Sequence, residues 1–213
     1  MTDELVKGLA EFKRYQYAED SSLMNVLAKE GQSPRYFIIS CIDSRTNPGT
    51  IFRARPGTFF AHKAMGAIVR PYKTGTALAA ALQFALNYNK VDTIIVLGHT
   101  QCGAVKALAE NIDDEEIASF ISVVKHAHDD AEKCCSAGED INAETEKRVV
   151  LESVENLKKY PSVAKALEEK RVTIKPWIFD IAAGDLLEHS EQSQSFETIT
   201  TDLTPEEDSR QDA

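Results

Sequence analysis

Residues 36–45 read YFIISCIDSR and residues 92–102 read DTIIVLGHTQC. Each stretch begins with a short apolar run of the length that is typical of a buried strand. Each then ends in cysteine, histidine or charged side chains. In parallel α/β sheets, ligand sites form beyond the carboxyl ends of the strands. The two stretches therefore predict such a sheet, with a functional site at the edge where both strands end.

The rest of the chain supports the same fold class. Residues 58–61 (TFFA) and 172–181 (VTIKPWIFDI) are predicted to be strands, and a turn at 183–185 leads into a further C-terminal strand. Helical patterns alternate with these strands and span residues 74–88, 114–136 and 143–169. We expect an α/β fold, with a mainly parallel four-stranded sheet flanked by helices and extended by the extra C-terminal strand.

Two segments flank this core. Apolar residues recur at helical spacing over about residues 1–30, which predicts an N-terminal helical arm. After about residue 190 the composition becomes acidic and polar. We expect one α/β domain over residues 1–190, arm included, and an acidic C-terminal extension over 191–213.

Composition excludes several classes of function. The formal net charge is −10 and the basic residues are scattered, which argues against nucleic acid as a partner. The longest apolar run, residues 77–82, is far shorter than the roughly 20 residues of a membrane span. The N-terminus lacks the apolar core of a signal peptide, so we expect a cytoplasmic protein without membrane contact.

Cysteines in a reduced compartment are more often metal-binding or catalytic than cross-linked. Two thiolates and one imidazole are a common ligand set for Zn²⁺, and three protein ligands leave a fourth position open. Cys41, His99 and Cys102 offer that set. Arg45 would supply a cation beside a site that becomes negative once hydroxide binds.

Other interpretations of these residues stay open on spacing alone. Cys41 is also suited to a place in the apolar core, or to the role of a nucleophile that Arg45 activates. The tyrosine-phosphatase loop does not fit, because only three residues separate this cysteine from the arginine. Cys134 and Cys135 lie in a polar helical stretch and are interpreted as incidental.

The two motifs together resemble the signature of the β-carbonic anhydrases. Cys-x-Asp-Ser-Arg begins at Cys41, and Gly-His-Thr-x-Cys-Gly-Ala begins at Gly98. Segments that also resemble this family are GQSP at 31–34, RPG at 55–57, ESVENL at 152–157 and WIFD at 177–180. The resemblance covers roughly residues 23–190.

The resemblance implies a role for each matching residue. Cys41, His99 and Cys102 would bind one Zn²⁺ per subunit. Asp43 would accept a hydrogen bond from zinc-bound hydroxide while Arg45 holds it, although in some family members this aspartate binds the metal instead. The residues expected to bind substrate are Gln32 and Gly103 for bicarbonate, and Phe60 and Phe84 for CO₂. His62 is a candidate proton shuttle.

The function implied is that of a lyase that reversibly hydrates CO₂ to bicarbonate and a proton. Hydrolysis of carbonyl sulfide or carbon disulfide at the same zinc site is the alternative, and a non-catalytic zinc or bicarbonate-binding module is an alternative of another class. From the resemblance we also expect a homodimer or a higher even-numbered homo-oligomer, with the N-terminal helices packed on the partner.

The sequence departs from the family at two places. The usual Arg-Asn-x-(Ala/Gly)-Asn is replaced by KAMGA at residues 63–67, and Leu-His-Gly-Trp is replaced by IKPW at 174–177. Alanine cannot form the hydrogen bonds of asparagine, and lysine lacks the planar fork of arginine. We expect these changes near the substrate pocket and the subunit contact, and not among the zinc ligands.

Overall fold

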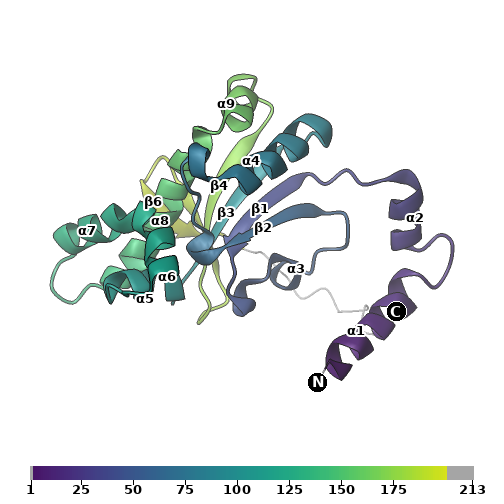
Figure 1. Cartoon of the computed structure of the whole chain (residues 1–213), viewed down its shortest axis with the longest axis horizontal. Helices are drawn as coiled ribbons and strands as arrows, with labels where there is room; N and C mark the ends of the chain where they lie inside the picture. Colours follow the sequence, from purple (N-terminus) through teal and green to yellow (C-terminus); the bar gives the residue numbers. More distant parts are fainter. Residues whose placement is uncertain (1, 201–213) are drawn as a thin grey trace. The chain divides into compact units, whose positions relative to one another are not determined.

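The computed structural model describes residues 2–200 (Figure 1). The described chain divides into an N-terminal unit, residues 2–33, and a larger unit, residues 34–199. The larger unit contains the sheet and all of the expected metal ligands. No helix among the described residues is both long enough and apolar enough to cross a membrane.

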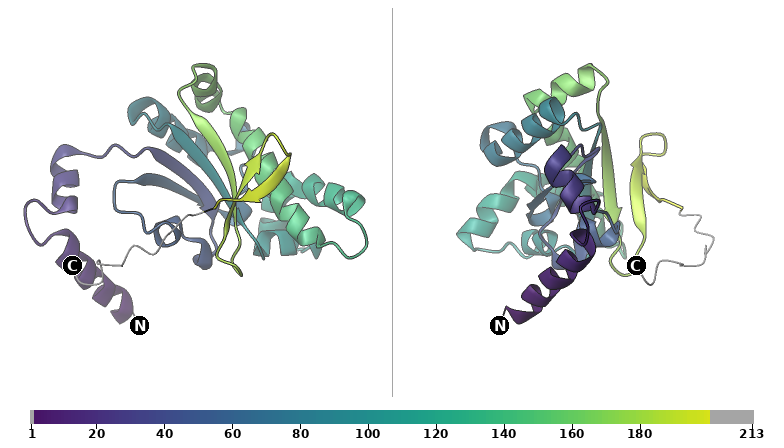
Figure 2. Two further views of the ribbon diagram at one scale, coloured as in Figure 1. Left: turned by 180° about the vertical axis from the view of Figure 1, so that it is seen from behind. Right: turned by 90° about the vertical axis from the view of Figure 1, so that its right-hand side faces the viewer.

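A six-stranded sheet forms the centre of the larger unit, in the order β2-β1-β3-β4-β5-β6 (Figure 2). The first four strands in this order are parallel, and β5 and β6 are antiparallel. The strands are β1 (Tyr36–Cys41), β2 (Phe59–Ala64), β3 (Thr93–His99), β4 (Thr173–Phe179), β5 (Leu186–Ser190) and β6 (Ser195–Thr198). The predicted fold class and its first five strands are confirmed.

Strand β6 was not predicted, and it lies in residues that we had assigned to the acidic extension. It pairs with β5 from Ser190↔Ser195 to Leu187↔Thr198. Its segment carries a single large apolar residue, Phe196, whose ring packs edge-to-face on His189 at 5.3 Å. A mostly polar strand of this kind depends on its partner strand, so local pattern misses it. The sheet therefore continues past residue 190, while residues 201–213 lie outside the described part.

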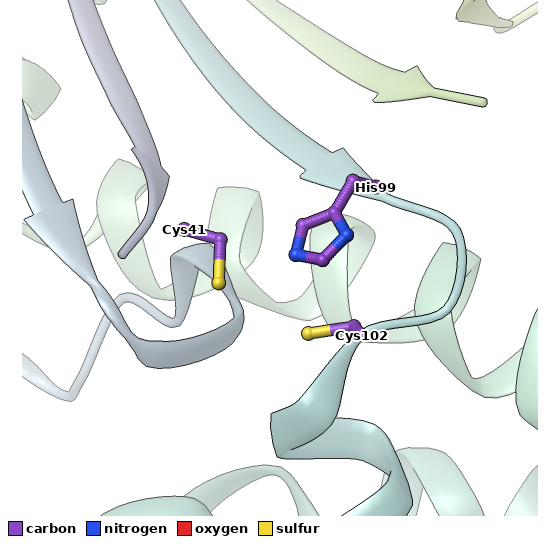
Figure 3. Close-up of side chains that lie close together, drawn as sticks. All are labelled: Cys41, His99 and Cys102. Atoms are coloured by element: carbon purple, nitrogen blue, oxygen red, sulfur yellow. The ribbon is translucent and has the colours of Figure 1, made fainter. Parts of the chain in front are cut away.

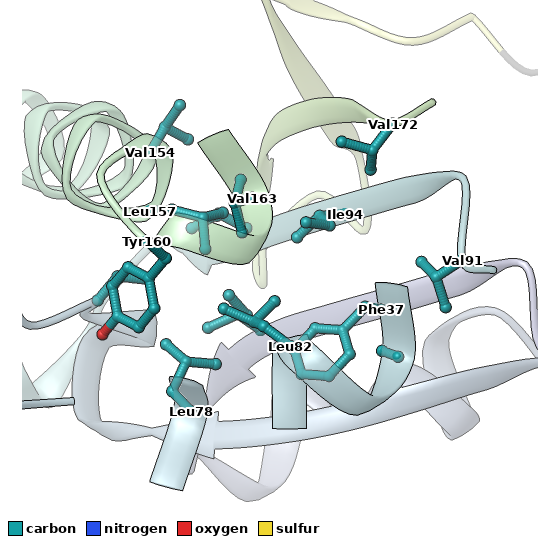
Figure 4. Packing of buried hydrophobic residues seen from close by; sticks show 14 of the residues in the cluster. Phe37, Leu78, Leu82, Val91, Ile94, Val154, Leu157, Tyr160, Val163 and Val172 are labelled. Atoms are coloured by element: carbon teal, nitrogen blue, oxygen red, sulfur yellow. The ribbon is translucent and has the colours of Figure 1, made fainter. Parts of the chain in front are cut away.

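Helices cover one face of the sheet and enclose the main core (Figure 4). Strands β1 and β3 supply Phe37, Ile39, Ile94 and Val96 to it, each at most 2% exposed. The helices of this unit are α3 (Pro48–Ile51), α4 (Thr76–Gln83), α5 (Gly103–Ala109), α6 (Glu115–Ile121), α7 (Lys125–Cys134), α8 (Ile141–Lys158) and α9 (Pro161–Glu168). Opposite this core, Ile38, Ile95 and Leu97 form a smaller cluster.

Three predicted helices are interrupted in the structure, and the first of them, 114–136, forms α6, a 3₁₀ turn (Ser122–Val124) and α7. The segment 143–169 forms α8 and α9, which part at Tyr160 because Pro161 begins a new helix. Asp140 caps the start of α8 by accepting hydrogen bonds from the N–H groups of Asn142 and Ala143. The segment 74–88 is α4 followed by a π-helical turn, Phe84–Tyr88.

The N-terminal unit contains α1 (Asp3–Gln16) and α2 (Leu23–Glu30), as the helical spacing predicted. Neither helix buries a residue. On α1, Leu5 is 76% exposed and Leu9 is 56% exposed. Packing of the apolar stripe supplies most of the stability of an amphipathic helix, and this stripe is exposed in α1.

Candidate metal centre

The three predicted ligands come together at the carboxyl edge of the sheet (Figure 3). Cys41 ends β1, His99 ends the neighbouring strand β3, and Cys102 caps the N-terminus of α5. Their ligand atoms all lie within 4.8 Å of one another, and each residue is at most 5% exposed. Among residues 2–200, no carboxylate joins this group. The set therefore has the three-ligand form that leaves one metal position open.

The orientation of His99 fits a metal ligand. Its Nδ1 lies 2.9 Å from the carbonyl oxygen of Thr100, and because a carbonyl only accepts, this nitrogen carries the proton. Nε2 is then left with a lone pair. That atom is buried and has no hydrogen-bond partner in the described protein. A buried nitrogen without a partner is costly, and a metal ion between the two thiols would satisfy it.

The thiols have unequal proton affinities. The hydrogen bond from the Cys102 thiol lowers the pKa of Cys41, and His99 and the N–H of Asp43 lower it further. The same hydrogen bond, together with burial, raises the pKa of Cys102. One thiolate thus forms readily and the second is held as a thiol. A divalent cation favours the loss of both protons, so metal binding releases protons.

The departing segment 63–67 contacts a ligand directly. Gly66 donates its backbone N–H to Cys41 Sγ at 3.3 Å, and Met65 packs in the apolar cluster that contains Cys41 and Cys102. None of residues 63–67 belongs to the ligand cluster, and their expected place near the substrate pocket and the subunit contact stays a prediction. Because β2 pairs with β1 as far as Cys41↔Ala64, the residues after β2 wrap around the end of β1.

Asp43 and Arg45 form a closed pair beside the ligands. Asp43 Oδ1 accepts from the backbone N–H and the Nε of Arg45, at 2.8 and 3.0 Å, and Oδ2 accepts from Nη2 at 2.8 Å. These hydrogen bonds lower the pKa of Asp43 to about 2. The carboxylate is therefore charged at neutral pH. A carboxylate offers about four acceptor positions, so one remains free on Oδ2.

Glu146, on α8, is a site residue that sequence reasoning missed. Its Oε1 accepts the backbone N–H of Cys102 at 2.8 Å, and the residue is 5% exposed. Burial raises the pKa of Glu146, although the Cys102 N–H opposes this effect. The available signal was its position, because Glu146 falls in register with the buried Val149, Val150 and Ser153 of the same helix.

Two substitutions at Glu146 are expected to have different effects. Glu146→Gln keeps an acceptor for the Cys102 N–H, whereas Glu146→Ala leaves that buried N–H unpaired and costs about 1–3 kcal/mol. The pKa of Glu146 is higher in the folded chain than in the unfolded chain. The contribution of Glu146 to stability therefore declines as pH rises through its folded-state pKa. Urea unfolding of metal-free protein at pH 7 should rank the glutamine variant at or above the parent. Equal losses in both variants would contradict this assignment.

The predicted substrate residues are distributed differently. Phe60 and Phe84 meet edge-to-face, with ring centroids 5.9 Å apart. Phe60 faces Phe37, four residues before the Cys41↔Ala64 pair, which is about 13 Å along the strand. The chain thus brings these rings to each other but not to its own metal ligands.

Other candidate residues also have defined places. Gly103 begins α5 directly after Cys102, and a Cβ built on it meets no atom within 4 Å. Gln32 belongs to the N-terminal unit. Burial lowers the pKa of the half-buried His62, on β2. Cys134 accepts a hydrogen bond from Arg148 Nη2 at 3.1 Å and lies at the end of α7, outside the ligand cluster.

A parallel sheet that carries two thiols and an imidazole at its carboxyl edge defines an α/β protein with three potential ligands for a transition metal. A sequence model described as carbonic anhydrase matches residues 36–186. The carbonic anhydrase of Synechococcus elongatus is 29% identical over 199 residues, covering 89% of this chain and 72% of that protein. The chain therefore belongs to the carbonic anhydrase family, and its relatives place it in the β class.

Solved structures agree with this assignment. The β-carbonic anhydrase CcaA aligns with a TM-score of 0.81 and 25% identity, over 94% of this chain and 93% of that one. A tetrameric β-carbonic anhydrase of the ascomycete Sordaria macrospora aligns with a TM-score of 0.75 over 87% of this chain and 96% of that one. At 21% identity, the second likeness concerns the fold alone.

Proposed function

We propose that this chain is a zinc-dependent enzyme that reversibly hydrates CO₂ to bicarbonate and a proton. The observation that carries the proposal is the buried cluster of Cys41, His99 and Cys102, with the unpartnered Nε2 of His99 among its ligand atoms. A bound Zn²⁺ lowers the pKa of water from about 15.7 toward 7 and so supplies a nucleophile at neutral pH. Membership of the family supports the reaction.

The chain's own residues would orient the reacting water. Asp43 stays ionised, because its pKa is about 2, and its free Oδ2 position would accept a hydrogen bond from that water. Arg45 holds the carboxylate through three hydrogen bonds, and its Nη2 also reaches the carbonyl of Gln101 at 3.4 Å. Two thiolates would balance the charge of a bound Zn²⁺, so the exposed guanidinium would offset the negative charge that hydroxide or bicarbonate adds.

Hydrolysis of carbonyl sulfide or carbon disulfide is the second candidate reaction. It is favoured by one observation, the pairing of Ala64, one of the departing residues, with the predicted ligand Cys41. The discriminating experiment measures kcat/KM for CO₂, carbonyl sulfide and carbon disulfide on one zinc-loaded preparation. We expect the highest value for CO₂. A higher value for either sulfur compound would replace the proposed substrate, and no turnover of any of them would leave a binding module.

We also propose that residues 34–199 form the catalytic domain of a cytoplasmic homodimer or tetramer, to which the N-terminal helices contribute contacts. Phe84 and Tyr88 stack at 6.0 Å and are 52% and 75% exposed. An apolar pocket of about 300 Å³ lies on the other face of the sheet, beside Phe52 and Trp177. Exposed aromatic surface of this kind is typical of an interface. A partner's surface would then complete the substrate pocket near Phe60.

This assembly predicts a measurable mass. At micromolar concentration the protein should sediment at two or four times the 23.6-kDa mass of the chain. Tyr88→Asp should shift it toward the monomer and lower CO₂ hydration about 10-fold, because a charge at an apolar contact remains without a partner. Sedimentation of the parent protein as a monomer would contradict the assembly.

A further inference from the structure

The loop between His99 and Cys102 is fastened to the end of β4 by Thr100. Its backbone N–H donates to the carbonyl of Phe179 at 3.0 Å. Its Oγ1 accepts the N–H of Ile181 at 3.0 Å and donates to Asp180 Oδ1 at 3.4 Å. Three hydrogen bonds therefore hold one residue between two ligands.

Asp180 is itself held in place by the turn that it organises. Its Oδ1 accepts the N–H groups of Ala182 and Ala183, at 2.9 and 3.1 Å. Its backbone N–H donates to Asp185 at 2.8 Å, and its carbonyl accepts from Gly184 at 2.8 Å. The Asp180 carboxylate, which accepts the hydrogen bond from the Thr100 hydroxyl, is thus held in one position between β4 and β5.

Thr100 directly follows the last paired residue of β3 and is still hydrogen-bonded to β4. The β3–β4 register ends at His99↔Phe179, and Gln101 then adopts a φ of 59° as the chain turns toward Cys102. The carbonyl of Thr100 is also the acceptor that orients the His99 ring, at 2.9 Å. A shift of Thr100 would therefore move the imidazole and the following thiol together.

We propose that Thr100 and Asp180 are positioning residues for the metal centre, which act through the contact between the Thr100 carbonyl and His99 Nδ1 and set the zinc affinity of the loop. The proposal rests on the proposed zinc function of the site. Neither side chain is a ligand. Outer residues that orient metal-binding histidines contribute about 10–100-fold to metal affinity when they are removed.

The test compares Thr100→Val with Thr100→Ser in the full-length protein. Valine matches threonine in shape but removes the acceptor of the Ile181 N–H and the donor to Asp180, whereas serine keeps both. We expect Thr100→Val to raise the Kd for Zn²⁺ about 10–100-fold in competition with a chromophoric chelator. Thr100→Ser should stay within about 3-fold of the parent.

A matched control separates positioning from general stability. Tyr160 is fully buried and its hydroxyl donates to the carbonyl of Arg70 at 2.8 Å, outside the ligand loop. Tyr160→Phe should lower the urea midpoint of metal-free protein and leave the Kd for Zn²⁺ unchanged. Asp180→Asn, which keeps the acceptor atom, should bind Zn²⁺ more tightly than Asp180→Ala.

The outcomes divide cleanly. A Kd for Zn²⁺ in Thr100→Val within about 3-fold of the parent would overturn the proposal, and so would an equal rise in Tyr160→Phe. If the parent binds Zn²⁺ but does not hydrate CO₂, the proposed function fails while the affinity ranking still decides the positioning role. A parent that does not bind Zn²⁺ would overturn both.

Discussion

The Cys41→Ser variant is expected to lose its zinc and to show a kcat/KM for CO₂ hydration lower by about 1,000-fold or more. Serine offers no thiolate, and without the metal the pKa of water returns from about 7 to 15.7, so the nucleophile at neutral pH is lost. The site has no substitute ligand, because no carboxylate of residues 2–200 joins the cluster. Elemental analysis and stopped-flow hydration on the same sample check both expectations.

Cys134→Ser is the matched control for this substitution. Cys134 is exposed, and its thiol contacts Arg148, away from the metal ligands. It should keep the metal content and the rate of the parent. Full zinc occupancy with an unchanged rate in Cys41→Ser would show that the metal or the reaction lies elsewhere.

Asp43→Ala is expected to lower kcat/KM about 100-fold while zinc content is retained. The residue is not a ligand but would orient the reacting water, and positioned proton acceptors contribute about 10²–10⁴-fold. Its pKa of about 2 places its titration far below the working range. The pH–rate profile of the parent between pH 5 and 9 should therefore contain no inflection from this carboxylate.

The stability linked to Asp43 follows from the same shift. Because its pKa is depressed on folding, the carboxylate contributes stability above about pH 3.8, and this contribution is lost as pH falls toward 2.

Asp92→Asn is the control for the loss of hydration expected in Asp43→Ala, since Asp92 pairs with Arg35 at 3.0 Å at the opposite end of β3. If this distant pair affects hydration as strongly as Asp43, the assigned role of Asp43 is wrong.

The short-range pattern of apolar residues correctly predicted the strands that lead to the site. The apolar runs before Cys41 and His99 identified β1 and β3, and parallel pairing then implied that both strands end at one edge. The structure confirms this meeting of ligands, with ligand atoms within 4.8 Å of one another. Both motifs lie at the ends of buried strands, so short-range reasoning was sufficient to predict that these three side chains meet.

The residues that surround the ligands could not be predicted in this way. Glu146 reaches Cys102 from 44 positions away, and Asp180 reaches Thr100 from 80 positions away. Such contacts depend on how α8 and β4 pack, which no local period encodes. The contact of Gly66 with Cys41 was not foreseen for the same reason, since it follows from the register of β1 with β2.

The most direct test of the account is a zinc titration of metal-free protein, followed at each step by stopped-flow CO₂ hydration. We predict that the rate rises in proportion to added Zn²⁺ and reaches its plateau at one equivalent per chain. Cys41→Ser should show no rise under the same conditions. A chain that takes up one equivalent of Zn²⁺ and still leaves CO₂ at its uncatalysed rate would contradict the proposed function.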